Sequence, residues 1–262
     1  MATAGEHRQR DIEKRLATAC VPIVDDWMTD LEEMGSQHFR DVPADELRIG
    51  AFLLVRKVIE FVAKEVGLVV ELDGGREDFR DLFLSGASVI VDAVDAQVDY
   101  TDGRSRRIAQ YCGRLASMMG LSDEEIAEIE YAARIHNLGL INTSQRVLRM
   151  PRQLSPAELS MARNHSQVGA DMIKPVEFLA PIVPMVRFHH ANWDGTGYPS
   201  GVGGEQIPFG ARVIRVADAF EAMMSVRPHR PAMSRDEALT ELARDAGKAF
   251  DPNLIKFAGA ML

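Results

Sequence analysis

The sequence predicts an all-α fold in two parts, a helical N-terminal domain over residues 1–92 and a multi-helix bundle over residues 93–262. Apolar residues recur at intervals of three and four through nearly every segment, which is the spacing of one face of a helix. Signals that start helices precede several of these segments. Strand-like runs are short and few, as at residues 68–72. These three observations argue against a sheet as the main framework.

The composition excludes several classes of partner. The chain has 262 residues, of which 46% are hydrophobic, enough for a substantial core. Its formal charge of −9 argues against broad binding to a nucleic acid polymer or an anionic membrane. Two cysteines do not make a disulfide framework, and no apolar run is long enough to cross a membrane. The N-terminus lacks the apolar core of a signal peptide, so we expect a cytoplasmic protein.

The N-terminal part carries no motif for a cofactor. Amphipathic helices are expected over residues 6–31 and 46–66, and a third over residues 79–98 that connects the two parts. We therefore expect these helices to serve homodimer formation, signal input or the docking of a protein partner in signalling.

The second part offers clear helix starts. Ser122 is followed three residues later by Glu125, which is a capping box. Ser155 precedes Pro156, a favoured first residue of a helix, and Ser234 caps another helix. The helix after Ser122 is expected to run as far as residue 140. Further helices are expected after residues 99–108 as far as Met119, over residues 180–190, around Asp218, and from Phe250-Asp251-Pro252 onward.

The stretch at residues 189–199 is the main functional signal. It reads His-His-Ala-Asn-Trp-Asp-Gly-Thr-Gly-Tyr-Pro, so two adjacent imidazoles lead directly into a tight loop. A lone His pair is also typical of a helix end beside a surface turn. Here other candidate ligands stand in helical patterns: His136, His165 and Asp218. Histidines and a carboxylate from several helices are how a helical protein builds a metal centre for phosphate chemistry.

Four motifs occur in order over the segment from Asp95 to Leu262: HHxxxDGxGYP, VADxF, Arg-Pro-His-Arg and Phe-Asp-Pro. This arrangement resembles the HD-GYP family, metal-dependent phosphohydrolases whose active members hydrolyse cyclic di-GMP. The resemblance implies a set of positions for metal ligands: His136, Asn137, His165, His189, His190 and Asp218. It implies a second set that contacts the dinucleotide: Asp194, Gly195, Gly197, Tyr198, Arg227 and Arg230. The two arginines are expected to contact its phosphates, which suit the planar guanidinium.

The chain departs from the family pattern at its metal positions. Arg104 stands where the first metal-binding His is expected, and arginine cannot lose its proton to bind a metal. Asn137 replaces the Asp that bridges two ions, and a neutral amide cannot offset their charge. Leu140 and Ala191 replace a Lys and a Glu, and Tyr100 stands where some relatives carry an acidic ligand. We expect Arg104 to substitute partly for one ion and to pair with Asp218.

Three functions remain open from the sequence. The first is a degenerate HD-GYP protein, impaired as a phosphodiesterase, that acts as a cyclic di-GMP receptor or protein-interaction module. The second is an active phosphodiesterase, or other phosphohydrolase, with an atypical metal site. The third is a purely structural scaffold. For the cofactor, the alternatives are one divalent transition metal ion (iron, manganese or zinc) or none.

Overall fold

The computed structural model describes part of the chain: residues 87, 91, 95, 103–143, 147, 150, 152–174, 176–226 and 231–261. Contacts along the backbone divide the chain into two units, Met1–Val94 and Asp95–Leu262. In the first unit the described residues are Ala87 and Val91, both helical and buried. The expected helices over 6–31 and 46–66 and the run at 68–72 lie outside the described residues.

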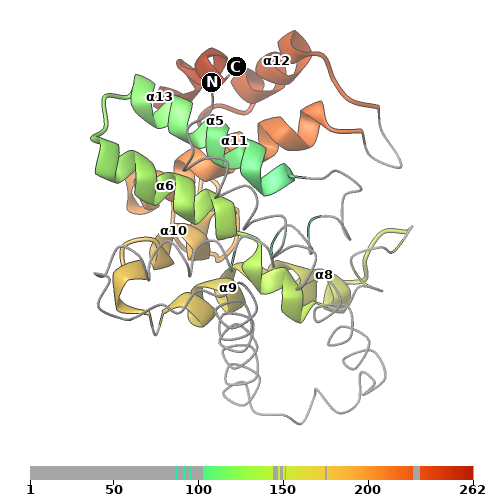
Figure 1. The fold of residues 1–262 in the computed structure, drawn as a ribbon. Coiled ribbons are helices and arrows are strands. Elements are labelled where there is room, and N and C mark those ends of the chain that lie inside the picture. The colour runs from blue at the N-terminus through green and yellow to red at the C-terminus, as the bar shows by residue number, and fades with distance from the viewer. Residues whose placement is uncertain are drawn as a thin grey trace. The chain divides into compact units, whose positions relative to one another are not determined.

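The described part of the second unit is built from helices (Figure 1). The α-helices are α5 (Arg104–Met118), α6 (Asp123–Ile135), α8 (Pro156–Arg163), α9 (His165–Ile173), α10 (Val183–Phe188), α11 (Phe209–Met224), α12 (Arg235–Arg244) and α13 (Pro252–Ile255). The 3-10 helices are η1 (Leu138–Asn142), η2 (Glu177–Leu179), η3 (Gly204–Gln206) and η4 (Ala258–Met261). The all-α prediction is confirmed, since the β pairing within these ranges is an isolated bridge between Ala246 and Phe250. Among the described helices, none combines the length and the apolar character that a membrane span requires.

Serine and aspartate residues start four of these helices. Ser122, Ser155 and Ser234 each accept a hydrogen bond from the backbone N–H of a glutamate three residues later, and each glutamate carboxylate accepts one from the serine N–H. Asp251 caps α13 through the N–H of Asn253. The predicted capping residues are thus confirmed, and they fix where the polypeptide turns into each helix.

The core lies between α5, α6 and α11. Ile108 and Leu115 of α5 are fully buried, as are Ile214 and Phe220 of α11. The ring of Phe220 meets that of Tyr111 edge to face at 5.4 Å. This packing holds the first residue of α5 beside the middle of α11, which brings Arg104 to the functional site.

Two predicted helix boundaries are wrong. The helix that begins at Asp123 ends at Ile135, and the chain continues as the 3-10 helix η1 rather than to residue 140. The backbone of η1 crosses α9 so closely that a Cβ at Gly139 would overlap the carbonyl oxygen of His165 and lie 2.5 Å from the Gly169 nitrogen. The helix expected over 180–190 is shorter, since α10 covers only Val183–Phe188. Its start fits Pro184, because proline is favoured in the first turn of a helix.

Candidate metal centre

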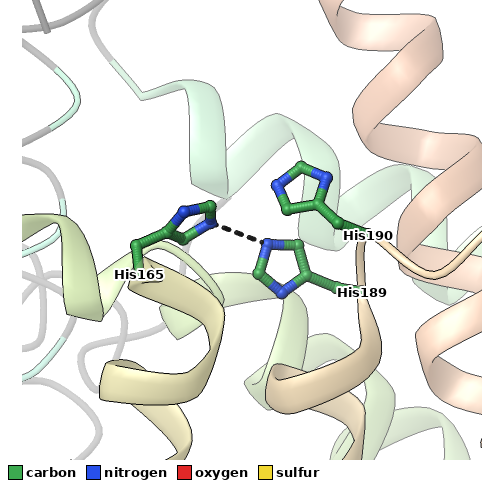
Figure 2. A group of neighbouring side chains, drawn as sticks. All are labelled: His165, His189 and His190. Carbon is green, nitrogen blue, oxygen red and sulfur yellow. Dashed lines mark hydrogen bonds between the residues drawn. The ribbon is translucent and has the colours of Figure 1, made fainter. Parts of the chain in front are cut away.

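Three histidines from two helices meet at one point (Figure 2). His165 is the first residue of α9, and His189 and His190 directly follow α10. One ring nitrogen from each lies within 4.8 Å of the others. The Nε2 atoms of His165 and His189 are 3.1 Å apart. The packing of α9 against α10 therefore gathers three imidazoles whose nitrogens converge.

Backbone carbonyls determine which nitrogen of each ring carries the proton. The Nδ1 atoms of His136, His165 and His189 lie 2.6–2.7 Å from the carbonyl oxygen three residues earlier. A carbonyl oxygen only accepts, so each Nδ1 must donate its N–H. In the neutral rings Nε2 then carries a lone pair directed away from the backbone. Metal-binding histidines are typically oriented by such a bond.

The resulting lone pairs fit a cation. With both Nδ1 atoms protonated, the Nε2 atoms of His165 and His189 carry lone pairs that face each other at 3.1 Å. Two facing lone pairs repel unless a cation or a shared proton lies between them. Burial lowers the pKa of His165 to about 4 and the pKa of His189 and His190 well below its usual value, so the rings stay neutral. The Nε2 of His136 is also buried and has no hydrogen-bond partner among the residues that the structure describes. Three of these residues, His165, His189 and His190, thus suit one transition metal ion.

The neighbouring position holds an arginine. Nη2 of Arg104 donates to Oδ1 of Asp218 at 2.8 Å, and Nε2 of His136 lies 3.8 Å from the same oxygen. Burial alone would raise the pKa of Asp218, but Arg104, followed by His136, lowers it to about 2. The carboxylate is therefore ionised and faces a fixed positive charge. These residues do not fit a second metal ion, because the guanidinium holds the carboxylate oxygen that would bind it.

Asn137 joins a polar group that includes a residue missed from the sequence. Its Nδ2 donates to Oδ1 of Asp95 at 3.4 Å, and Oδ2 of Asp95 accepts from the N–H and the hydroxyl of Ser105. Asp95 is buried, whereas Tyr100, the residue considered for an acidic ligand, lies outside the described residues. A signal for Asp95 was present. It follows Ala87 and Val91 at four-residue spacing, and a carboxylate on such a buried stripe needs polar partners.

The loop after His190 folds over the histidines. Oδ1 of Asp194 accepts from the N–H and the hydroxyl of Thr196, and Gly195 has a φ of 81°, which glycine adopts without strain. A Cβ at Gly197 would overlap the His190 carbonyl oxygen. The Tyr198 ring consequently lies against that of His190, with centroids 4.7 Å apart.

Other departures from the family pattern lie in the core. Leu140 is buried in η1. Ala191 is buried and packs against Ile207 and Ala211. Of the residues predicted to contact a dinucleotide, Tyr198 lies at the histidines and Asp194 is exposed, with its carboxylate bonded within the loop. Arg227 and Arg230 lie outside the described residues.

Comparison with known proteins connects this geometry to a family. The family model described as HD domain matches residues 88–254. The cyclic di-GMP phosphodiesterase response regulator RpfG of Xanthomonas campestris is 35% identical over 164 residues, which cover 60% of this chain and 43% of that protein. The 3'3'-cGAMP-specific phosphodiesterase 2 of Vibrio cholerae is 27% identical over 205 residues, covering 78% and 39%. The chain thus spans about two fifths of the length of these curated relatives.

A solved structure shares the fold. Bd1817, a HDG"Y"P protein from Bdellovibrio bacteriovorus, superposes with a TM-score of 0.52 at 16% sequence identity. The superposition covers 89% of this chain and 78% of that one. At this identity the likeness bears on the fold alone.

Proposed function

Since the chain belongs to the HD domain family, we propose that it is a member of the HD-GYP branch that acts as a cyclic di-GMP receptor with little or no phosphodiesterase activity. The observation that carries the proposal is the 2.8 Å ion pair between Arg104 and Asp218. In the HD-GYP pattern this position would hold a ligand of the second metal ion, so the pair would put a permanent organic cation there instead.

An arginine in place of a metal ligand should impair phosphodiester hydrolysis, because that reaction depends on two metal ions. Two-metal hydrolases activate a hydroxide between their ions and stabilise both the attacking and the leaving oxygen. Asn137 supplies a neutral amide where a bridging carboxylate is needed, and its Nδ2 is directed at Asp95. A guanidinium can attract a phosphate, but it does not lower the pKa of a bound water as a metal ion does. With Arg104 and Asn137 at these positions, the chain therefore still binds the dinucleotide but hydrolyses it poorly.

One metal ion remains compatible with the proposal. His165, His189 and His190 would hold iron, manganese or zinc through neutral imidazoles. When bound, such an ion supplies Lewis-acid polarisation of a phosphate oxygen. Tyr198 would cover this position, and Arg227 and Arg230 remain the predicted contacts to the dinucleotide phosphates.

The facing lone pairs of His165 and His189 favour a second candidate function, a slow phosphodiesterase that uses one metal ion. The dinucleotide also has two candidates, because relatives include phosphodiesterases named for cyclic di-GMP and for 3'3'-cGAMP. For the N-terminal residues we propose the docking of a protein partner or a second copy of the chain.

Calorimetric titrations of the full chain with cyclic di-GMP, and separately with 3'3'-cGAMP, in the presence of a chelator test the receptor function. Turnover is followed by chromatography after addition of Mn²⁺ or Fe²⁺. Binding with no turnover supports the receptor, and turnover with added metal supports the second candidate. Absence of binding to both dinucleotides contradicts the receptor and leaves a scaffold. Arg227→Ala and Arg230→Ala are expected to weaken binding, and unchanged affinity in both would refute their phosphate contacts.

A further inference from the structure

Two arginines near Tyr198, Arg163 and Arg215, have no carboxylate partner among the described residues. Five other arginines of the described residues form ion pairs: Arg104, Arg107, Arg152, Arg212 and Arg244. Arg187 and Arg235 form none there either, but they lie against Phe188 and the Gly259 carbonyl rather than Tyr198. The chain has 39 acidic and 30 basic residues, so acidic partners are plentiful. Arg163 and Arg215 lack a carboxylate partner and lie at the same site. This suggests that an anion from outside the chain binds to both guanidinium groups.

Arg163 belongs to a helix that makes little contact with the core. It is the last residue of α8, two positions before His165, and α8 buries none of its residues. The Arg163 side chain is exposed, and its guanidinium carbon lies 5.4 Å from the centroid of the Tyr198 ring. Core packing therefore does not account for the placement of this cation.

Arg215 approaches from α11. It precedes Asp218 by three residues, so both project from the same face of the helix. Its Nε and Nη2 donate to Oδ1 of Asn192 at 3.3 and 3.1 Å, which ties the cation to the loop two residues after His190. The oxygen that Arg215 contacts belongs to a neutral amide, and the carboxylate of Asp218 acts on this cation only through space, without an ion pair.

Tyr198 lies within the field of both cations. Burial raises the pKa of Tyr198, with a further contribution from Asp218, while Arg215 and Arg163 oppose the shift. The hydroxyl therefore stays protonated at neutral pH. It has no hydrogen-bond partner among the described residues, so its proton is available to an acceptor.

We propose that Arg163, Arg215 and the hydroxyl of Tyr198 form a subsite for a phosphodiester group beside the three histidines. The inference rests on the proposed function and deepens it, because it assigns contacts to the dinucleotide within the described part of the chain. Guanidinium groups and a hydroxyl are the donors that anionic phosphate oxygens accept from most strongly.

The test is calorimetric titration of the full chain and its variants with cyclic di-GMP. Arg163→Gln removes the charge and is expected to weaken binding about tenfold, the scale of one lost charge-assisted hydrogen bond. Arg163→Lys, which keeps the charge, is expected to lose less. Tyr198→Phe keeps the ring against His190 but removes the hydroxyl, and it should also weaken binding. Raising the salt concentration should reduce wild-type affinity more than that of Arg163→Gln.

Arg187→Gln is the matched control. Arg187 is exposed, and its guanidinium carbon also lies 5.4 Å from a ring centroid, that of Phe188. Its guanidinium lies over Phe188, whereas that of Arg163 lies over Tyr198, so the two variants differ in whether the changed side chain contacts the proposed subsite. The Arg187→Gln variant should bind cyclic di-GMP with the same affinity as the wild type.

The outcomes separate the subsite from the receptor function. Wild-type binding with unchanged affinity in both Arg163→Gln and Tyr198→Phe overturns the subsite and leaves the receptor standing. Equal losses in Arg163→Gln and Arg187→Gln also overturn it, because general electrostatics would explain them. If the wild type binds no cyclic dinucleotide, both proposals are wrong. Thermal unfolding of each variant shows whether a loss comes from misfolding, and Tyr198→Phe then provides an independent measurement.

Discussion

The guanidinium of Arg104 reaches from the first residue of α5 to the middle of α11 and donates to Oδ1 of Asp218 at 2.8 Å. Both side chains are 11% exposed, so the pair is shielded from water. An ionised carboxylate in such a place requires a nearby positive charge, which a metal ion or an arginine can supply. In this chain the arginine supplies it, and the fold around Asp218 therefore does not depend on a second metal ion.

Restoring the family's ligands at two positions is expected to restore metal loading. Arg104→His frees Asp218 and adds an imidazole, and Asn137→Asp adds a carboxylate that can bridge two ions. The new carboxylate would face Asp95, whose Oδ1 now lies 3.4 Å from the Asn137 Nδ2. The two carboxylates repel each other, so a cation bound between them becomes more favourable. Elemental analysis of protein purified without chelator should give two equivalents of metal for the double variant and at most one for the wild type.

Each single variant serves as a control for the double variant. Arg104→His alone lacks the bridge, and Asn137→Asp alone keeps the guanidinium on Asp218, so neither should gain the second equivalent. Two equivalents in the wild type would contradict our interpretation of Arg104 and would favour an active enzyme.

Gly139→Ala is expected to destabilise the fold. The new Cβ would overlap the His165 carbonyl oxygen and approach the Gly169 nitrogen, both of them backbone atoms that cannot move aside as a side chain can. Overpacking of this kind costs at least about 1–3 kcal/mol. The cost can be measured as a loss in the free energy of unfolding in urea. Because the clash is with the backbone of His165, which belongs to the proposed metal site, metal affinity should fall as well.

Gly259→Ala is the matched substitution, since a Cβ there meets nothing within 4 Å. It should leave the stability unchanged within about 0.5 kcal/mol. If Gly139→Ala were equally harmless, the close crossing of η1 and α9 would be refuted.

The sequence was sufficient for features that depend on local chemistry. Capping serines, helical periodicity and the ordered histidine motifs predicted the helix starts and the residues that converge, because these signals act over a few positions. The 3-10 turn after Ile135 was missed, since it depends on a tertiary crossing with α9. Asp95 was missed although it stands on the helical stripe of Ala87 and Val91, because nothing local in the sequence identifies its partners. Its partners Ser105 and Asn137 are brought together only by the packing of α5 against α6.

Cys112 is expected to resist thiol reagents in the folded protein. It is fully buried in α5, and burial raises the pKa of its thiol well above the usual value, with Asp218 and Glu130 adding to the shift. A raised pKa keeps the thiol protonated, and the thiolate is the reactive form. In a Cys20→Ser background, labelling with a disulfide reagent between about pH 7 and pH 9 should follow the rate of unfolding. Fast labelling in native buffer that increases with pH would contradict the buried assignment.

Asp95→Asn tests whether the buried carboxylate holds the start of α5 to the turn at Asn137. Oδ2 of Asp95 accepts two bonds from Ser105, and Oδ1 accepts one from Asn137. The amide that replaces it keeps the shape but offers only one acceptor oxygen, so one of these buried donors loses its partner. An unsatisfied buried group costs about 1–3 kcal/mol, which should appear in urea unfolding at neutral pH.

Ser105→Ala separates the contribution of the hydroxyl from that of the backbone N–H. In a double-mutant cycle, Asp95→Asn and Ser105→Ala should couple, because each removes one side of the same hydrogen bond. Additive effects would show that the hydroxyl bond contributes little and that Asp95 acts through the backbone N–H of Ser105 and through Asn137. Coupling would show that the hydroxyl holds the Asp95 carboxylate in place, and the same carboxylate accepts from the amide of Asn137 through its other oxygen.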